Sequence, residues 1–225
     1  MNHTTILLSR VRLWLLTAVF SLAIPVFANA AVTGLSFDGA NDYVTFGQAP
    51  GLGSPTFTIE TWFKRSAAGV AASTGTGGVS AIPLVSKGRS EADGTTQDMN
   101  YFLGIRASDG VLCADFEEGA TGVTPGLNHP IAGVTPVVNG VWYHAAATYD
   151  GVKWQLFLNG NLESELIVNR PPRADSIQHA ALGSALNSTG AASGFFNGVL
   201  DEVRIWNYAR SAVEMSAEGD VVLGR

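Results

Sequence analysis

Two tight-turn dipeptides, Asp150-Gly151 and Asn159-Gly160, stand between runs rich in β-branched and aromatic residues at 141–149, 152–158 and 162–168. Asp-Gly and Asn-Gly are strong local signals for a hairpin, because both residues tolerate the positive φ that a two-residue turn needs. The three runs are therefore predicted to form an antiparallel three-stranded meander.

Similar runs recur along the chain, separated by clusters of Gly, Asn, Asp and Pro, which is typical of an all-β protein. In residues 57–65, apolar side chains at 57, 59 and 63 alternate with the side chains at 58, 60, 62 and 64. This period of two indicates a strand with two different faces. Further strands are predicted at 34–37, 43–46, 82–86, 100–105, 111–116, 180–182 and 195–206.

A single segment has the signature of a helix. Ser211 and Glu214 form a capping box, which predicts a short helix through about Ala217. Many strands and one terminal helix indicate an all-β fold class, an antiparallel sandwich or barrel. Three long stretches, 67–80, 88–98 and 117–140, are predicted to be loops and are candidates for function.

The first thirty residues resemble an export signal. Arg10 and Arg12 precede an apolar run, and small residues at Ala28 and Ala30 match a signal-peptidase site. We expect a signal peptide at 1–30, one domain at 31–217 and a tail at 218–225. The apolar run of about twelve residues is shorter than the ~20 that span a bilayer, so no membrane span is expected after cleavage and the protein is predicted to be secreted or periplasmic.

Composition excludes several classes of protein. The single cysteine, Cys113, excludes a disulfide scaffold, and it is predicted to be a small buried residue. The formal charge of −6 becomes −8 once Arg10 and Arg12 are removed, and this acidic balance argues against nucleic-acid binding.

Five segments in order resemble a known family: 35–44, 57–63, 141–151, 156–160 and 198–206. They are similar to the bacterial laminin-G-like (LamG-like) domains of the concanavalin A-like lectin/glucanase superfamily. The resemblance covers about residues 33–217. It implies an all-β, two-sheet antiparallel jelly-roll sandwich in which the first and last strands are neighbours. The fold hosts lectins, adhesion modules and polysaccharide-degrading enzymes, so function must be argued from the site.

A calcium site is the first candidate. The resemblance brings the strands that carry Asp38, Asp42 and Asp201 together, and carboxylates suit Ca²⁺. A structural Ca²⁺ at this seam is therefore expected, with Asp201 as the first ligand. The alternative is that Asp38 and Asp42 serve turns and that Asp201 pairs with Arg204 or caps a loop.

A carbohydrate site is the second candidate. Three of the four tryptophans after residue 30, Trp62, Trp142 and Trp206, occupy family motif positions and are expected in the core. Ligand contacts are therefore assigned to loop-borne polar residues. These are Asn100, Tyr101, Arg106, Asn128 and His129.

Catalysis is the third candidate, and it has the least support. No run with the carboxylate spacing of the superfamily's glycosidases occurs; Asp115 with Glu117 and Glu163 with Glu165 come nearest. Each pair would share one strand face, and solvated surface charge is the expected role. Tyr143 and His144 alternate onto opposite faces and cannot share a pocket, and His144 is expected to be a hydrogen-bonded core residue.

The favoured function is an exported lectin-like module that binds carbohydrate or an extracellular protein ligand through its loop rim. Two alternatives stay open. One is a polysaccharide lyase or glycoside hydrolase with an atypical catalytic set, and the other is a structural or adhesion protein of the cell envelope.

Overall fold

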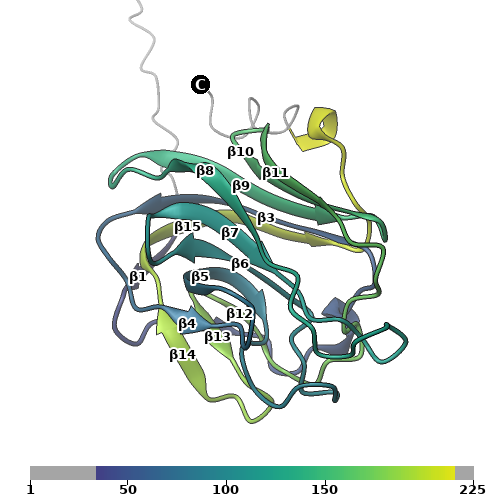
Figure 1. The fold of residues 1–225 in the computed structure, drawn as a ribbon. Coiled ribbons are helices and arrows are strands. Elements are labelled where there is room, and N and C mark those ends of the chain that lie inside the picture. Colours follow the sequence, from purple (N-terminus) through teal and green to yellow (C-terminus); the bar gives the residue numbers. More distant parts are fainter. Residues whose placement is uncertain (1–33, 216–225) are drawn as a thin grey trace, which may run out of the picture. The chain divides into compact units, whose positions relative to one another are not determined.

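The structure is a computed structural model that describes residues 34–215 of the chain. Within this part, two antiparallel sheets face each other as a sandwich (Figure 1). The expected all-β, two-sheet fold class is therefore confirmed.

The first sheet has six strands in the order β1-β15-β3-β9-β10-β11. Their bounds are β1 Leu35–Asp38, β15 Asn197–Trp206, β3 Phe57–Arg65, β9 Trp142–Tyr149, β10 Lys153–Leu158 and β11 Asn161–Ile167. Strands β1 and β15 pair from Leu35 opposite Leu200 to Asp38 opposite Asn197. The first and last strands are thus neighbours, as the family resemblance implied.

The second sheet has the order β2-β12-β5-β6-β7-β8, with β4 also paired to β5, and a separate hairpin joins β13 to β14. The bounds are β2 Val44–Thr45, β12 Ala180–Leu182, β5 Ser80–Lys87, β6 Tyr101–Arg106, β7 Val111–Asp115, β8 Ile131–Pro136, β4 Ala72–Ser73, β13 Ser184–Leu186 and β14 Ala192–Phe195. A 3-10 turn, η1, covers Pro50–Leu52.

The predicted meander is present as β9, β10 and β11. At its second turn, Asn159 and Gly160 have φ of 50° and 75°, as a two-residue hairpin requires. At the first turn only Gly151 has a positive φ, and Asp150 Oδ1 accepts hydrogen bonds from the N–H groups of Val152 and Lys153. Here the aspartate side chain closes the turn.

The main core fills the space between the two sheets. Phe57 and Trp154 of the first sheet pack in it with Leu103 and Leu112 of the second sheet, and all four are at most 1% exposed. A second apolar cluster lies on the outer face of the seven-stranded sheet. β4, β13 and the start of β5 contribute side chains to it. Cys113 belongs to this second cluster. Its prediction as a small buried residue is confirmed, and burial raises the pKa of its thiol.

The expected loops contain strands that the sequence pattern concealed. β4 lies within 67–80, β8 lies within 117–140, and the β13–β14 hairpin was not predicted. β4 has two residues, while β8 contains Gly133 and Pro136, which strand patterns disfavour. Their pairing depends on neighbouring strands and is invisible in local sequence.

The tryptophan prediction was wrong in a specific way. Trp154 is the tryptophan in the core, whereas Trp62, Trp142 and Trp206 are half-buried on the outer face of the six-stranded sheet. There each has a ring or cation partner: Trp62 lies 5.3 Å from the His144 ring, Lys64 lies 5.2 Å over Trp142, and Arg210 lies 4.7 Å over Trp206. His144 is 6% exposed, as buried as expected, but it too lies on this outer face, 3.6 Å from the carboxylate of Glu60.

The capping box is confirmed. Ser211 N–H and its hydroxyl bond to Glu214 Oε2, and the N–H of Glu214 donates back to Ser211 Oγ. The expected signal at 1–30, the end of the helix and the tail at 218–225 lie outside the described residues. Among residues 34–215, the structure contains no helix with the length and hydrophobicity that a membrane crossing requires.

Candidate functional site

An open groove of ≈ 670 Å³ lies beside the outer face of the seven-stranded sheet. Its lining comes from three segments: 78–80, 106–108 and 130–132. A second hollow of ≈ 410 Å³ shares residues 106–108 and is bordered by Arg65, Asp109 and Asn139. We call the two hollows together the Arg106 groove, because Arg106 lines both.

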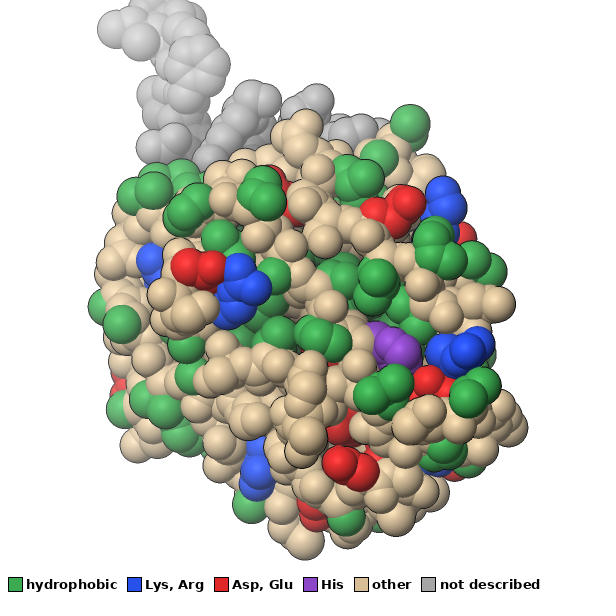
Figure 2. All heavy atoms as spheres, viewed as in Figure 1, with side chains coloured by type: hydrophobic (Ala, Val, Ile, Leu, Met, Phe, Trp, Pro, Cys, Tyr) green, Lys and Arg blue, Asp and Glu red, His purple; other side chains and the backbone are tan. Residues whose placement is uncertain are grey.

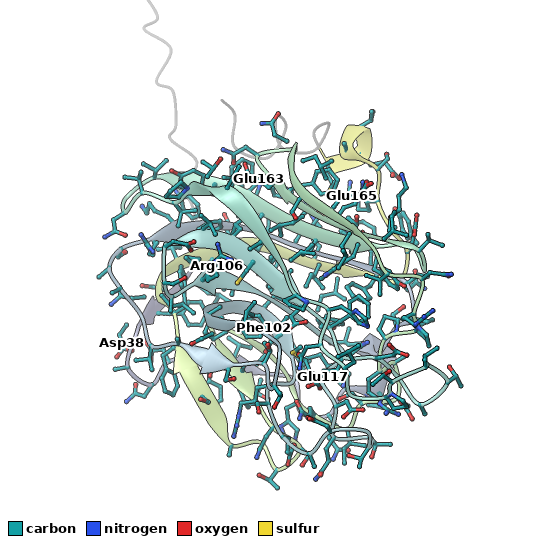
Figure 3. The ribbon with its side chains drawn as sticks, viewed as in Figure 1. Asp38, Phe102, Arg106, Glu117, Glu163 and Glu165 are labelled. Carbon is teal, nitrogen blue, oxygen red and sulfur yellow. The ribbon has the colours of Figure 1, made fainter. Side chains whose placement is uncertain are left out.

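Arg106 is the last residue of β6 (Figure 3). Asp109, in the turn that follows, holds its side chain in place. Its Nε and Nη2 lie 3.0 and 2.6 Å from the two carboxylate oxygens of Asp109. Hydrogen bonding to Arg106 lowers the pKa of Asp109, and the same bonds raise the pKa of Arg106. The side chains remain 34% and 43% exposed, so a fixed guanidinium and a fixed carboxylate face the groove with hydrogen-bonding capacity to spare.

A second guanidinium, that of Arg65, is also fixed at the groove. Its Nε donates to Asn139 Oδ1 at 2.7 Å and its Nη2 donates to the carbonyl of Val137 at 2.9 Å. None of the lining residues is aromatic. The groove can therefore recognise planar or hydroxylated polar groups by hydrogen bonding, but it offers no ring on which a ligand could stack.

Asn100 and Tyr101, two of the sequence-predicted ligand residues, are completely buried. The amide of Asn100 accepts from the N–H and donates to the carbonyl of Ser54, at 3.0 and 3.2 Å. The hydroxyl of Tyr101 donates to the carbonyl of Leu52 at 3.1 Å. In this arrangement both side chains anchor the segment around η1 and do not reach a ligand.

Asn128 and His129 immediately precede the groove residues 130–132. His129 is partly buried: its ring lies 4.9 Å from that of Phe116 and its Nε2 lies 3.3 Å from Glu118 Oε2. Desolvation lowers the pKa of His129. Asn128 is 6% exposed and turns inward. Of the five predicted ligand residues, Arg106 is therefore the one that lines the groove.

The three aspartates proposed for calcium do not meet. Asp38 Oδ1 accepts from the N–H groups of Ala40 and Asn41, and Asp42 Oδ2 accepts from the N–H of Asp38. Asp38 is paired with Asn197 of β15. Asp201 lies four residues further along that strand, a distance of roughly 13 Å from Asn197.

Asp201 Oδ1 instead accepts from the N–H of Glu202. The turn and loop-capping roles that were the alternative account for these aspartates, and the three do not fit one Ca²⁺ ion. Within residues 34–215, no three His, Cys, Asp or Glu side chains gather as a metal site would require.

Asp115 and Glu117 share the outer face of the second sheet, as alternation predicted, but they are not solvated. They are 0% and 1% exposed, because the loop at 74–79 folds over them: Thr74 Oγ1 donates to Asp115 Oδ2 at 2.6 Å. Burial raises the pKa of Asp115 to about 7 and that of Glu117 to about 9. The sequence spacing identified this pair of carboxylates. The sequence contained no signal, however, that the loop at 74–79 covers the pair.

Glu163 and Glu165 lie on the exposed strand β11, as expected for solvated charge (Figure 3). Glu165 pairs with Lys153 at 3.8 Å, and Glu163 binds backbone and side-chain groups of β8. Neither carboxylate lines the Arg106 groove.

Known proteins of similar fold bind glycans. The family model described as the concanavalin A-like lectin/glucanases superfamily (Laminin_G_3) matches residues 38–216. No curated protein sequence matches the chain.

Among solved structures, the CBM40 of the Ruminococcus gnavus IT-sialidase, bound to alpha2,3 sialyllactose, aligns with a TM-score of 0.59 and 16% identity over 83% of this chain and 95% of that one. Domain 4 of AbnA, a GH43 extracellular arabinanase from Geobacillus stearothermophilus in complex with arabinotriose, aligns at 0.55 and 15% over 84% and 78%. The heptameric SAP-like pentraxin from Limulus polyphemus aligns at 0.51 and 16% over 80% and 78%. At such identities the likeness concerns the fold alone.

Proposed function

Because the chain belongs to the Laminin_G_3 family of the concanavalin A-like lectin/glucanase superfamily, we propose that it is an exported carbohydrate-binding module whose ligand occupies the Arg106 groove. The observation that carries the proposal is the Arg106–Asp109 pair, bidentate and partly exposed in an open groove. The similar folds of two modules solved with bound oligosaccharides support it.

The chemistry of the groove suits sugar hydroxyls. A guanidinium donates and a carboxylate accepts in fixed directions, so adjacent hydroxyls of one sugar ring can be bound by both at once. Since Asp109 and Asn139 already orient the two arginines, little side-chain entropy is lost on binding. Without an aromatic platform, a single site is expected to bind weakly, and repeated sites on a polysaccharide would strengthen binding.

Export rests on residues 1–30 alone and stays a prediction. A calcium ion at Asp38, Asp42 and Asp201 is not part of the proposal, because those carboxylates do not fit one ion.

The proposal is tested by applying the purified full chain to immobilised polysaccharides, namely arabinan, xylan, β-glucan, polygalacturonate and alginate, together with sialyllactose. We expect at least one of these to bind and Arg106→Ala to weaken its affinity about 10- to 100-fold, since a hydrogen bond to a charged group contributes about 1.5–3 kcal/mol.

Lys153→Ala is the matched control, because Lys153 is an exposed cation of the other sheet. It should bind as the unaltered chain does. Arg106→Ala must also keep the melting temperature of that chain, so that lost binding is not lost folding. Failure of every probe to bind, or unchanged affinity of Arg106→Ala, would contradict the proposal.

A further inference from the structure

Asp115 and Glu117 form an acidic pair that no basic side chain balances. Both are buried, and within residues 34–215 neither has a Lys, Arg or His at ion-pair distance. The buried carboxylate of Asp98, by contrast, has a cationic partner. Arg173 donates to it through Nε and Nη2 at 2.9 and 2.5 Å. Glu117 Oε2 accepts from the N–H of Met99 and Asp115 Oδ2 accepts from Thr74, but two buried carboxylates without a cationic partner are costly to a fold.

Two oxygen atoms at this place also find no hydrogen-bond partner within the described part of the chain: Asp115 Oδ1 and Asn128 Oδ1. The Asn128 amide is oriented by its other end, since Nδ2 donates to the carbonyl of Thr76 at 3.1 Å and lies 3.4 Å from Glu117 Oε1. Its oxygen is at the opposite end of the amide and meets no donor among residues 34–215. Buried oxygens of this kind are normally satisfied.

The unpartnered Asn128 Oδ1 lies close to Gly78, together with Asp115 Oδ2, the oxygen that accepts from Thr74. A Cβ added to Gly78 would lie 2.7 Å from Asp115 Oδ2 and 2.8 Å from Asn128 Oδ1, and would also touch Thr74 Oγ1. Three side-chain oxygens from β7, the segment before β8 and the 74–79 loop thus approach one point, where only a residue without a side chain fits. Glu117 Oε1 lies on the Nδ2 side of the same Asn128 amide, 3.3 Å from the position that a Cβ on Gly75 would take.

We propose that Asp115, Glu117, Asn128 and Thr74 form a binding site for one hard divalent cation, Ca²⁺ being the ion that suits them. Every available donor is oxygen, with two carboxylates, one amide carbonyl and one hydroxyl, which favours Ca²⁺ over metals that prefer nitrogen or sulfur. The ion would balance the two carboxylates and supply the partner that Asn128 Oδ1 lacks. This site lies apart from Asp38, Asp42 and Asp201, and it does not depend on the proposed function.

Binding of an ion at this site would affect the Arg106 groove, because the ligands of the ion connect to two of the three segments that line the groove. Thr74 closes the loop that leads into 78–80, and Asn128 leads into 130–132. The ion would enter beside Gly78, which lines the groove.

The test measures the melting temperature and calcium binding of the full chain after treatment with EDTA. Adding millimolar CaCl₂ should raise the melting temperature by several degrees, and titration calorimetry should give one ion per chain. Asp115→Asn should abolish both effects. Glu165→Gln, which removes an equal charge from the exposed strand β11, should keep them.

A second variant keeps the proposal falsifiable if Asp115→Asn does not fold. Asn128→Ala removes one oxygen without altering charge and should lower the calcium affinity at least tenfold. Absence of both a thermal shift and binding heat in the unaltered chain would overturn the proposal. In that case the Asp115–Glu117 pair would be neutralised by bound protons, and Asp115→Asn should be more stable than the parent. A calcium response that survives Asp115→Asn and Asn128→Ala but disappears in Asp38→Asn would overturn it as well.

Discussion

Glu163 is an exposed-strand carboxylate that links two strands from different sheets. Its Oε2 accepts from the N–H groups of Val134 and Thr135 at 2.7 and 2.9 Å, and its Oε1 accepts from the Thr135 hydroxyl at 2.8 Å. Burial raises the pKa of Glu163, but these three bonds outweigh it and hold the pKa below its ordinary value. Hydrogen bonds to the ionised form therefore stabilise the contact between β8 and β11.

Glu163→Gln is predicted to lower the free energy of unfolding by about 1 kcal/mol at pH 7, as loss of a charge-assisted bond does. A carboxylate with a depressed folded pKa stabilises above its unfolded pKa, and this contribution is lost as pH falls through the folded value. The difference between variant and parent should thus shrink as pH falls below about 4.5. Urea unfolding from pH 3 to pH 7 measures it, and Glu165→Gln should show a smaller difference; equal losses at all pH values would contradict the account.

At the scale of elements, β15 pairs with β3 inside the six-stranded sheet. Gly198 sets how closely these two strands approach each other. It has a φ of 154°, and a Cβ there would overlap the carbonyl of Lys64 and lie 2.7 Å from the ring of Phe196. Because the colliding atom belongs to the backbone of β3, the strand itself would have to move. The pairing Gly198 opposite Arg65 depends on this contact.

Gly198→Ala is therefore predicted to destabilise the chain by roughly 2–3 kcal/mol, the range for overpacked positions. Gly51→Ala is the matched control, since a Cβ at Gly51 meets nothing within 4 Å, and it should change stability by less than about 0.5 kcal/mol. Thermal unfolding of the two variants checks this. Similar melting temperatures for both would show that the strands can move apart at little cost.

At the scale of the molecule, both sheets share a single main core, and Trp154 lies at its centre. Its ring is fully buried among Phe57, Phe116 and Tyr149, at centroid distances of 5.6, 5.4 and 6.3 Å. Its Nε1 donates to the carbonyl of His129 at 3.0 Å. Because both sheets contribute to this packing, unfolding of one sheet would remove the packing of the other.

Trp154→Phe is predicted to cost about 2–4 kcal/mol, from lost buried volume and an unpaired carbonyl. The secondary and tertiary structure should still unfold in one shared transition at a lower temperature. Circular dichroism in the far and near ultraviolet measures both, and Trp142→Phe, at a half-buried outer position, should have a smaller effect. Separate transitions for the two signals would contradict a single cooperative core.

The surface on the side seen in Figure 2 mixes acidic and basic side chains among polar and apolar ones, with no large area of one charge. In the proposed function, recognition would therefore depend on local groups such as Arg106 and Asp109 and on their fixed geometry.

By itself, the amino-acid sequence determined what depends on neighbours along the chain: the strand alternation around Phe57, the turn at Asn159-Gly160 and the capping box at Ser211. The face shared by Asp115 and Glu117 also follows from it, because side chains alternate with a period of two. Only the tertiary structure decided which faces are covered. It buried Asp115 under the loop of Thr74, left Trp62 on an outer face and separated Asp201 from Asp38, because periodicity states which residues share a face and contains no information about what packs on it.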